Sequence, residues 1–224
     1  MTTIVILQSN YIPWRGYFDL MRRADHFVIY DEVQFTKNDW RNRNIIVTRQ
    51  GPAWLTISAR TGARFGQPIR ETQVSDTRWA EKHWRTIAQA YARAPHIADF
   101  RQQLEDLYKR AQAFTGLSEI NVMFLRALAG MAGITVNIVD STGLAGPAGK
   151  TERLVGICKS LNADTYLSGP AAQAYLELDR FQQAGIAVEW ISYPNYPAYR
   201  QNDGEYRVGV SMIDTLLMTG SAGL

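Results

Sequence analysis

Polar side chains that can bind a ligand or move a proton gather between residues 8 and 44 of this chain. They follow or separate short apolar runs, in places where a segment concerned only with folding would have simple turn residues. The carboxyl ends of strands are where α/β proteins keep their ligand sites. We therefore interpret this segment as the functional centre. Its candidate residues are Gln8, Asn10, Tyr11, Asp31, Gln34, Lys37, Trp40, Asn42, Arg43 and Asn44.

The types of these side chains suit the orientation of a polar small molecule. Asp31, Gln34 and Lys37 combine an acid, an amide and an ammonium directly after a buried run. Trp40 adds an indole that can enclose a ligand. Arg43 offers fork-shaped donors of the kind that bind carboxylate or phosphate. The alternative interpretation is a solvated loop.

Two further side chains have both a chemical and a structural interpretation. His83 lies near Trp79 and Trp84 in a stretch of helical spacing. It is either a hydrogen-bonded packing residue or a neutral imidazole suited to general-base work. Ser168 ends a short apolar run and precedes a Gly-Pro pair. A helix cap is its first interpretation, and a ligand contact or a nucleophile stays open.

The segment 143–151 resembles a phosphate-binding loop only in part. The Walker pattern requires glycine at position 144, where this chain has Leu144, and Pro147 removes a backbone donor. A plain loop with Thr151 as the cap of the following helix is favoured. A phosphate or carboxylate beside Lys150 at that helix N-terminus stays open.

The composition is ordinary for a globular protein and excludes several classes of function. The chain has 224 residues and a net charge of +3, which allows a phosphate-bearing or acidic ligand, but no polybasic arm indicates DNA binding. The single cysteine, Cys158, excludes an internal disulfide, and the histidines lack metal-ligand spacing. We find neither a signal segment nor a run long enough to span a membrane, so we expect a cytoplasmic protein.

The apolar patterns predict a chain in which strands and helices alternate at both ends. Continuous apolar runs at 4–7 and 27–30 indicate buried parallel strands, with a helix at 17–24 between them. We predict one α/β domain, residues 1–224, with a three-layer Rossmann-like fold, a mostly parallel sheet and an insertion at about 33–132 that holds a β-hairpin and a helical segment. The other expected elements are a hairpin of 45–47 with 54–57, helices at 77–92, 97–113 and 118–131, strands at 134–139, 165–168 and 186–191, and helices opened by Thr151, Pro170 and Ser211.

Taken together, these landmarks resemble the WbqC-like family of bacterial proteins. The matches run in order along almost the whole chain, with Ser9 where the resemblance leads us to expect proline. The matching segments are Gln8-x-x-Tyr-x-Pro-Trp-x-Gly-Tyr-Phe18, Ala24-Asp25, Phe27-Val28, Asp31-x-Val-Gln-Phe-x-Lys37, Trp40-x-Asn-Arg-Asn44, Trp54-Leu55, Trp79-x-x-x-His83, Tyr166-Leu-Ser-Gly169 and Ser211-Met-Ile-Asp-Thr-Leu216.

The resemblance implies a small-molecule biosynthetic enzyme, because such proteins are encoded beside genes for surface polysaccharides, amino-sugar modification and natural products. Our leading hypothesis is a transferase that forms an amide by acyl or aminoacyl transfer to an amine of a sugar or metabolite. The expected catalytic residues are Asp31 or His83, as acceptor of the amine proton, and Lys37. The expected substrate-binding residues are Gln8, Tyr11, Gln34, Trp40, Asn42, Arg43, Asn44 and Ser168.

Two other hypotheses stay open. The first is a nucleotide-dependent activating enzyme, because the opening segments look like the start of a nucleotidyltransferase fold, although Tyr11 and Gly16 stand where that fold would have histidines. The second is a non-catalytic binding module of a polysaccharide or natural-product pathway. We expect a small-molecule substrate, no metal and no cofactor, and no DNA or membrane partner. An acyl carrier protein or aminoacyl-tRNA as donor, and a homodimer, stay open.

The enzymatic interpretation depends on one spatial expectation. Gln8, Asp31, Lys37 and Asn44 must converge on a shared cavity.

Overall fold

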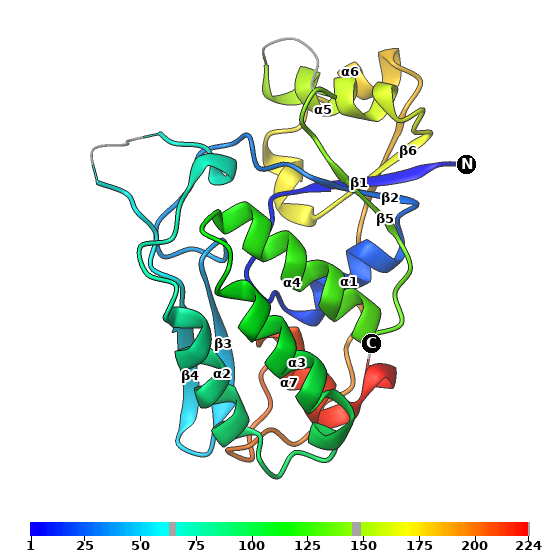
Figure 1. The fold of residues 1–224 in the computed structure, drawn as a ribbon. Coiled ribbons are helices and arrows are strands. Elements are labelled where there is room, and N and C mark those ends of the chain that lie inside the picture. The colour runs from blue at the N-terminus through cyan, green and yellow to red at the C-terminus, as the bar shows by residue number, and fades with distance from the viewer. Residues whose placement is uncertain (63–65, 145–148, 224) are drawn as a thin grey trace.

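A parallel sheet forms the centre of the protein. In the computed structural model, which describes residues 1–62, 66–144 and 149–223, five strands pair in the order β5-β2-β1-β6-β7, and neighbours run parallel (Figure 1). The prediction of a three-layer Rossmann-like α/β fold with a mostly parallel sheet is confirmed. The strands are β1 (Thr3–Leu7), β2 (His26–Ile29), β5 (Asn137–Asp140), β6 (Thr165–Ser168) and β7 (Ala187–Trp190).

Both faces of this sheet are buried, which explains the continuous apolar runs in the sequence. In β1, Ile4 and Ile6 belong to one hydrophobic core and Val5 to the other. Successive side chains of a strand point to opposite faces, so a strand covered on both sides needs an apolar residue at every position. β2 alternates in the same way, with Phe27 and Val28 in opposite cores.

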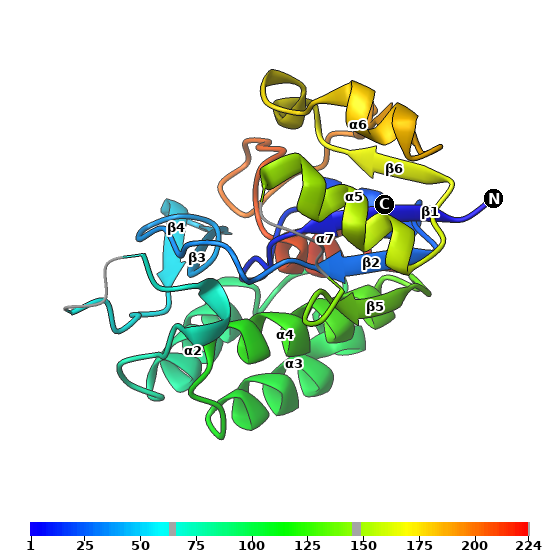
Figure 2. The same cartoon turned by 90° about the horizontal axis from the view of Figure 1, so that it is seen from above.

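Helices cover the two faces. Figure 1 shows α5 and α6 on one side of the sheet and α1 and α4 on the other. Seen from above, α2, α3 and α4 extend together along one side of the molecule (Figure 2). No helix among the described residues is long and apolar enough to cross a membrane. The helices are α1 (Arg15–Arg22), α2 (Trp79–Ala90), α3 (Ile97–Ala111), α4 (Leu117–Met131), α5 (Lys150–Ser160), α6 (Leu178–Gln183) and α7 (Met212–Thr219), with short 3-10 turns η1 (Ile69–Glu71), η2 (Pro170–Ala174) and η3 (Ser221–Gly223).

The chain between β2 and β5 holds the predicted hairpin and three helices. The hairpin strands are β3 (Arg43–Thr48) and β4 (Gly51–Thr56), which form a separate antiparallel sheet. Their register leaves Arg49 and Gln50 as a two-residue loop. Gly51 follows at φ +110°, a conformation that glycine adopts without steric cost. The outer face of the hairpin carries Arg43 and the exposed Trp54.

Several helix starts differ from their sequence-based prediction. Thr151 does not cap α5, because the cap position is Gly149, and the Thr151 hydroxyl instead accepts a hydrogen bond from the Glu177 backbone, 3.4 Å away. Pro170 opens the short η2, and α6 follows as a separate helix. The predicted start of the last helix at Ser211 is confirmed, and the Ser211 hydroxyl caps that helix by accepting from the Ile213 amide at 3.2 Å. Pro147 lies outside the described residues.

The end of α4 explains why the next strand begins later than predicted. Gly133 has φ +69° and donates to the Gly130 carbonyl at 3.0 Å, while the Ile134 amide donates to the Ala129 carbonyl at 2.9 Å. This pair of bonds is a Schellman motif, in which the residue after the glycine closes the helix. Ile134 therefore completes α4, and β5 starts only at Asn137.

Gly133→Ala tests this helix end. We expect the free energy of unfolding in urea to fall by about 1 kcal/mol, because an alanine in the left-handed region is strained, although no atom lies within 4 Å of the added Cβ. Gly130→Ala is the matched control, since Gly130 lies inside α4 with equally open space. The control should leave stability unchanged or raise it. Equal effects of the two substitutions would contradict the motif.

Candidate functional site

The strand order defines where a ligand site is expected. From β1 the chain moves outward through β2 to β5 on one side, and then returns to β6 and β7 on the other. The order therefore reverses between β1 and β6. In open α/β sheets such a switch point leaves a crevice at the carboxyl ends of the two strands.

A cavity of about 430 Å³ lies at this switch point. Gln8 from the end of β1 and Ser168 from the end of β6 line it, together with Lys150, the first residue of α5. Tyr30, Tyr166 and Tyr175 supply aromatic walls. A largely apolar cavity with a few polar groups is typical of small-molecule sites, and a helix N-terminus with a lysine favours an anionic group.

Asp31 fixes the turn between β1 and α1. One carboxylate oxygen accepts from the Ser9 amide at 2.8 Å, and the other accepts from the Ser118 hydroxyl at 2.5 Å. Asp31 is only 4% exposed. Burial raises the pKa of its carboxyl, and the bonds from Ser118 and Ser9 oppose that rise. Both oxygens accept hydrogen bonds from the protein, so Asp31 holds the turn in this geometry, and its role as a proton acceptor stays a prediction.

Asn121 links this turn to the segment before β3. Its side-chain nitrogen donates to the Ser9 hydroxyl at 3.1 Å and to the Arg41 carbonyl at 2.9 Å. Asn121 is fully buried. The serine at position 9 thus provides both an amide for Asp31 and a hydroxyl for Asn121. Proline at this position would provide neither.

Arg41 is a site residue that the sequence analysis missed. Its guanidinium donates to the Gln8 side-chain oxygen at 3.1 Å and also to that of Asn10. The side chain is 17% exposed, and the nearest carboxylate, Asp39, is 4.0 Å away. In the motif Trp40-x-Asn-Arg-Asn44, Arg41 occupies the unspecified position. Its proximity to Gln8 depends on how the segment before β3 folds back onto the β1 turn, which spacing alone does not reveal.

Tyr11 and His83 belong to a buried aromatic cluster. The Tyr11 hydroxyl lies 2.9 Å from His83 Nδ1 and 2.9 Å from the Tyr108 hydroxyl. Trp79 and Phe124 pack against the Tyr11 ring. Burial lowers the pKa of His83 to about 4. The packing interpretation of His83 therefore fits its surroundings better than general-base work, and Tyr11 is a core residue.

The two asparagines of the same motif are structural ties. Asn42 donates to the Ile57 carbonyl at 2.8 Å, and Asn44 donates to the Tyr11 carbonyl at 3.1 Å. Both side chains are at most 3% exposed. Asn42 joins the two ends of the hairpin, and Asn44 holds the hairpin against the turn that follows β1.

The remaining predicted residues lie in other places. Gln34 and Lys37 are exposed and line a hollow with Thr61 and Gly66. Trp40 lines a third hollow, and Arg43 packs over the Trp54 ring with its guanidinium 4.2 Å from the ring centroid.

The expected convergence is therefore wrong, and the enzymatic interpretation that rested on those four residues loses its basis; an enzymatic interpretation has to rest on the switch-point cavity instead. Gln8 lines this cavity, Asp31 is buried outside its lining, Asn44 borders the hollow at Trp40, and Lys37 lies at another hollow. The cavity instead combines Gln8 and Ser168 with Lys150, which the sequence had offered only as an open alternative.

The comparisons with known proteins cover almost the whole chain. The model of the WbqC-like protein family matches residues 8–224, from Gln8 onward. The chain belongs to the WbqC-like family. This WbqC-like chain is also 42% identical over 221 residues to the "Uncharacterized protein Rv1507c" of Mycobacterium tuberculosis (strain ATCC 25618 / H37Rv), covering 99% of the chain and 95% of that relative. No solved structure matches it.

A double-mutant cycle tests the bond between Asp31 and Ser118. Asp31→Ala should lower the free energy of unfolding by about 1–3 kcal/mol, because it leaves buried donors unpaired. Ser118→Ala should cost less in the Asp31→Ala background than alone, giving a coupling energy above about 0.5 kcal/mol. The control cycle uses Asp39 and Thr36, an exposed pair at 2.6 Å. Purely additive effects at Asp31 and Ser118 would contradict the positioning role.

The low pKa of His83 predicts a pH dependence of stability. Between pH 6.5 and 4 the unfolded chain binds a proton at this histidine and the folded chain does not, so the free energy of unfolding should fall as pH falls. The loss approaches about 3 kcal/mol by pH 4. His83→Phe should remove that slope and His96→Gln, at a surface histidine, should retain it. A slope unchanged in His83→Phe would show that the imidazole is not held neutral.

Proposed function

We propose that this protein is a small-molecule biosynthetic transferase, which forms an amide by passing an acyl or aminoacyl group to an amine of a sugar or metabolite. The observation that supports this function is the switch-point cavity, which combines Lys150 and the N-terminus of α5 with aromatic walls and the polar groups of Gln8 and Ser168. An activated acyl donor has matching parts, an anionic phosphate or carboxylate and a less polar remainder.

The donor occupies the cavity with its anionic group at Lys150. The ammonium and the positive end of the α5 dipole attract that group. Tyr30, Tyr166 and Tyr175 pack against the remainder of the donor. The acyl carbon then lies toward Gln8, at the end of β1.

Arg41 stabilises the charge that develops during transfer. The amine nitrogen attacks the acyl carbon, the bond from that carbon to the leaving oxygen or sulfur breaks, and the amine proton ends on the leaving group. Negative charge builds on the acyl oxygen as the nitrogen approaches. A guanidinium held by Gln8 and Asn10 is a fixed positive group beside this point. Asp31 acts indirectly, by fixing the turn.

A nucleotide-dependent activating enzyme is the second candidate. The strand order and a cavity at its switch point favour it, because dinucleotide- and mononucleotide-binding folds bind their ligands at this place. Under this proposal the anionic group at Lys150 is the phosphate of ATP or CTP. Binding of either nucleotide, measured by calorimetry, separates the two candidates.

Lys150→Ala tests the donor site in a screen of acyl donors with the purified protein. Carrier-protein thioesters, coenzyme A thioesters and aminoacyl-tRNA esters are each offered with amine acceptors. For the active donor, we expect KM to rise about tenfold or more in Lys150→Ala, because a charge-assisted contact is lost.

Lys159→Ala is the matched control, since Lys159 is exposed in the last turn of the same helix. It should leave KM unchanged, and Lys150→Arg should restore much of the affinity. Absence of transfer from every donor class would remove the proposed function. Transfer with equal KM in both alanine variants would remove the donor site.

A further inference from the structure

The hollow at Trp40 has a volume of about 270 Å³ and includes residues of the turn that follows β1 in its lining. Its lining includes Asn10, Trp14, Trp40, Asn44 and the pair 208–209. Among the residues that the structure describes, no charged side chain lines it. The hollow therefore suits a neutral or weakly charged ring and provides no group to bind a phosphate.

The exposed Trp40 lines this hollow, and the exposed Trp54 lies next to Trp40. Trp40 is 43% exposed and Trp54 is 48% exposed, and their ring centroids lie 5.7 Å apart at an interplanar angle of 33°. Arg43 packs over the Trp54 ring, so the hairpin supports a stack of three side chains that ends at Trp40. Trp40 is thus held at the edge of the hollow with close to half of its surface exposed.

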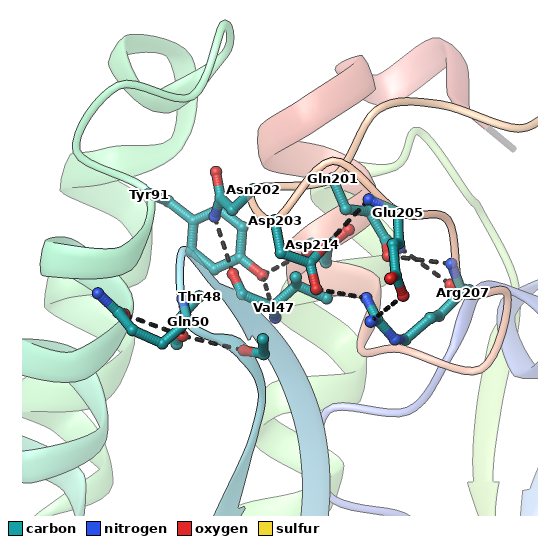
Figure 3. A network of polar contacts seen from close by, with 11 residues as sticks. Val47, Thr48, Gln50, Tyr91, Gln201, Asn202, Asp203, Glu205, Arg207 and Asp214 are labelled. Atoms are coloured by element: carbon teal, nitrogen blue, oxygen red, sulfur yellow. Dashed lines mark hydrogen bonds and ion pairs between the residues drawn. The ribbon is translucent and has the colours of Figure 1, made fainter.

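The opposite wall is held in place by the C-terminal segment. The Ser211 amide donates to the Ile45 carbonyl at 2.8 Å, and the Met212 amide donates to the Pro13 carbonyl at 2.7 Å. Figure 3 shows the neighbouring network, in which Gln201 bonds the Arg207 backbone and Arg207 pairs with Asp203. These bonds fix the chain on both sides of residues 208–209, so the hollow is preformed.

The same network joins this segment to the hairpin and α2. Figure 3 shows Tyr91 between β3 and α7, where the Val47 amide donates to its hydroxyl at 3.0 Å and the hydroxyl donates to Asp214 at 2.5 Å. Asn202 donates to the Val47 carbonyl at 2.8 Å. Both walls of the hollow therefore belong to one connected framework.

We propose that this hollow binds the pyranose ring of a sugar. A pyranose has a face of weakly positive C–H bonds and an edge of hydroxyl groups. The negative face of the Trp40 indole attracts the C–H face, and the side-chain amide of the half-buried Asn10 pairs with the hydroxyl edge. The volume is below the range of about 300–1,000 Å³ for drug-sized ligands, which fits one sugar ring.

Arg41 connects this site to the switch-point cavity. Its guanidinium contacts Gln8, which lines the cavity, and Asn10, which lines the hollow. If the proposed function holds, on which this assignment rests, the hollow is the acceptor site and an amino sugar is the acceptor. The sugar amine then faces the donor across Arg41.

Saturation-transfer NMR with glucosamine, N-acetylglucosamine and methyl glucoside tests the sugar site on the whole protein without any donor. We expect transfer to the ring C–H protons and a rise in Kd of about three- to tenfold in Trp40→Ala, as for the loss of an aromatic contact. Trp40→Phe should restore most of the binding, and Trp190→Phe on β7 is the control that leaves it unchanged. Unfolding midpoints of all variants establish that they fold.

The outcomes separate this inference from the proposed function. Transfer to none of the sugars, or sugar binding unchanged in Trp40→Ala, overturns the sugar site. Binding of adenosine or indole in place of the sugars also overturns it, since planar bases stack on exposed aromatic rings too. Acyl transfer to amines that is unaffected by Trp40→Ala leaves the proposed function intact without a sugar acceptor. Sugar binding without any acyl transfer keeps the sugar site and removes the proposed function.

Discussion

The carboxylate of Asp31 holds the turn that follows the central strand, and the arrangement of the site depends on that turn. Its oxygens accept from the Ser9 amide and the Ser118 hydroxyl, which ties the end of β1 to α4. Asn121 extends the tie from Ser9 to the Arg41 backbone. A carboxylate this deeply buried is costly unless its oxygens are paired. The hydrogen bonds that pair this carboxylate therefore fix the backbone that carries Gln8 and Asn10.

The fixed turn separates two hollows of different chemistry. The switch-point cavity has Lys150 and a helix N-terminus on its border, whereas the hollow at Trp40 has indole and amide groups and no lining charge among the described residues. Arg41 contacts a residue of each. A reaction between an anionic donor and a ring-shaped acceptor needs two such neighbouring sites held in constant relation. Under the proposed function, one substrate lies on each side of the turn.

Local patterns in the sequence predicted the fold well and the site in part. Apolar runs such as residues 4–7 must be strands covered on both faces, and Ser211 has the side chain of a helix cap, so these elements follow from local chemistry. The roles of Asp31 and Arg41 depend on contacts with Ser118 and Asn10, which are distant in the chain. Residue types cannot show whether a polar side chain faces a cavity or satisfies a buried neighbour. Asn42, Asn44 and His83 are of the second kind.

A crystal structure of the protein soaked with an activated acyl donor, such as a coenzyme A thioester, tests whether the donor binds in the switch-point cavity. We expect donor density in the switch-point cavity, with the anionic group at Lys150 and the acyl carbon near Gln8 and Arg41. Density for the donor at Gln34 and Lys37, with the switch-point cavity empty, would contradict it.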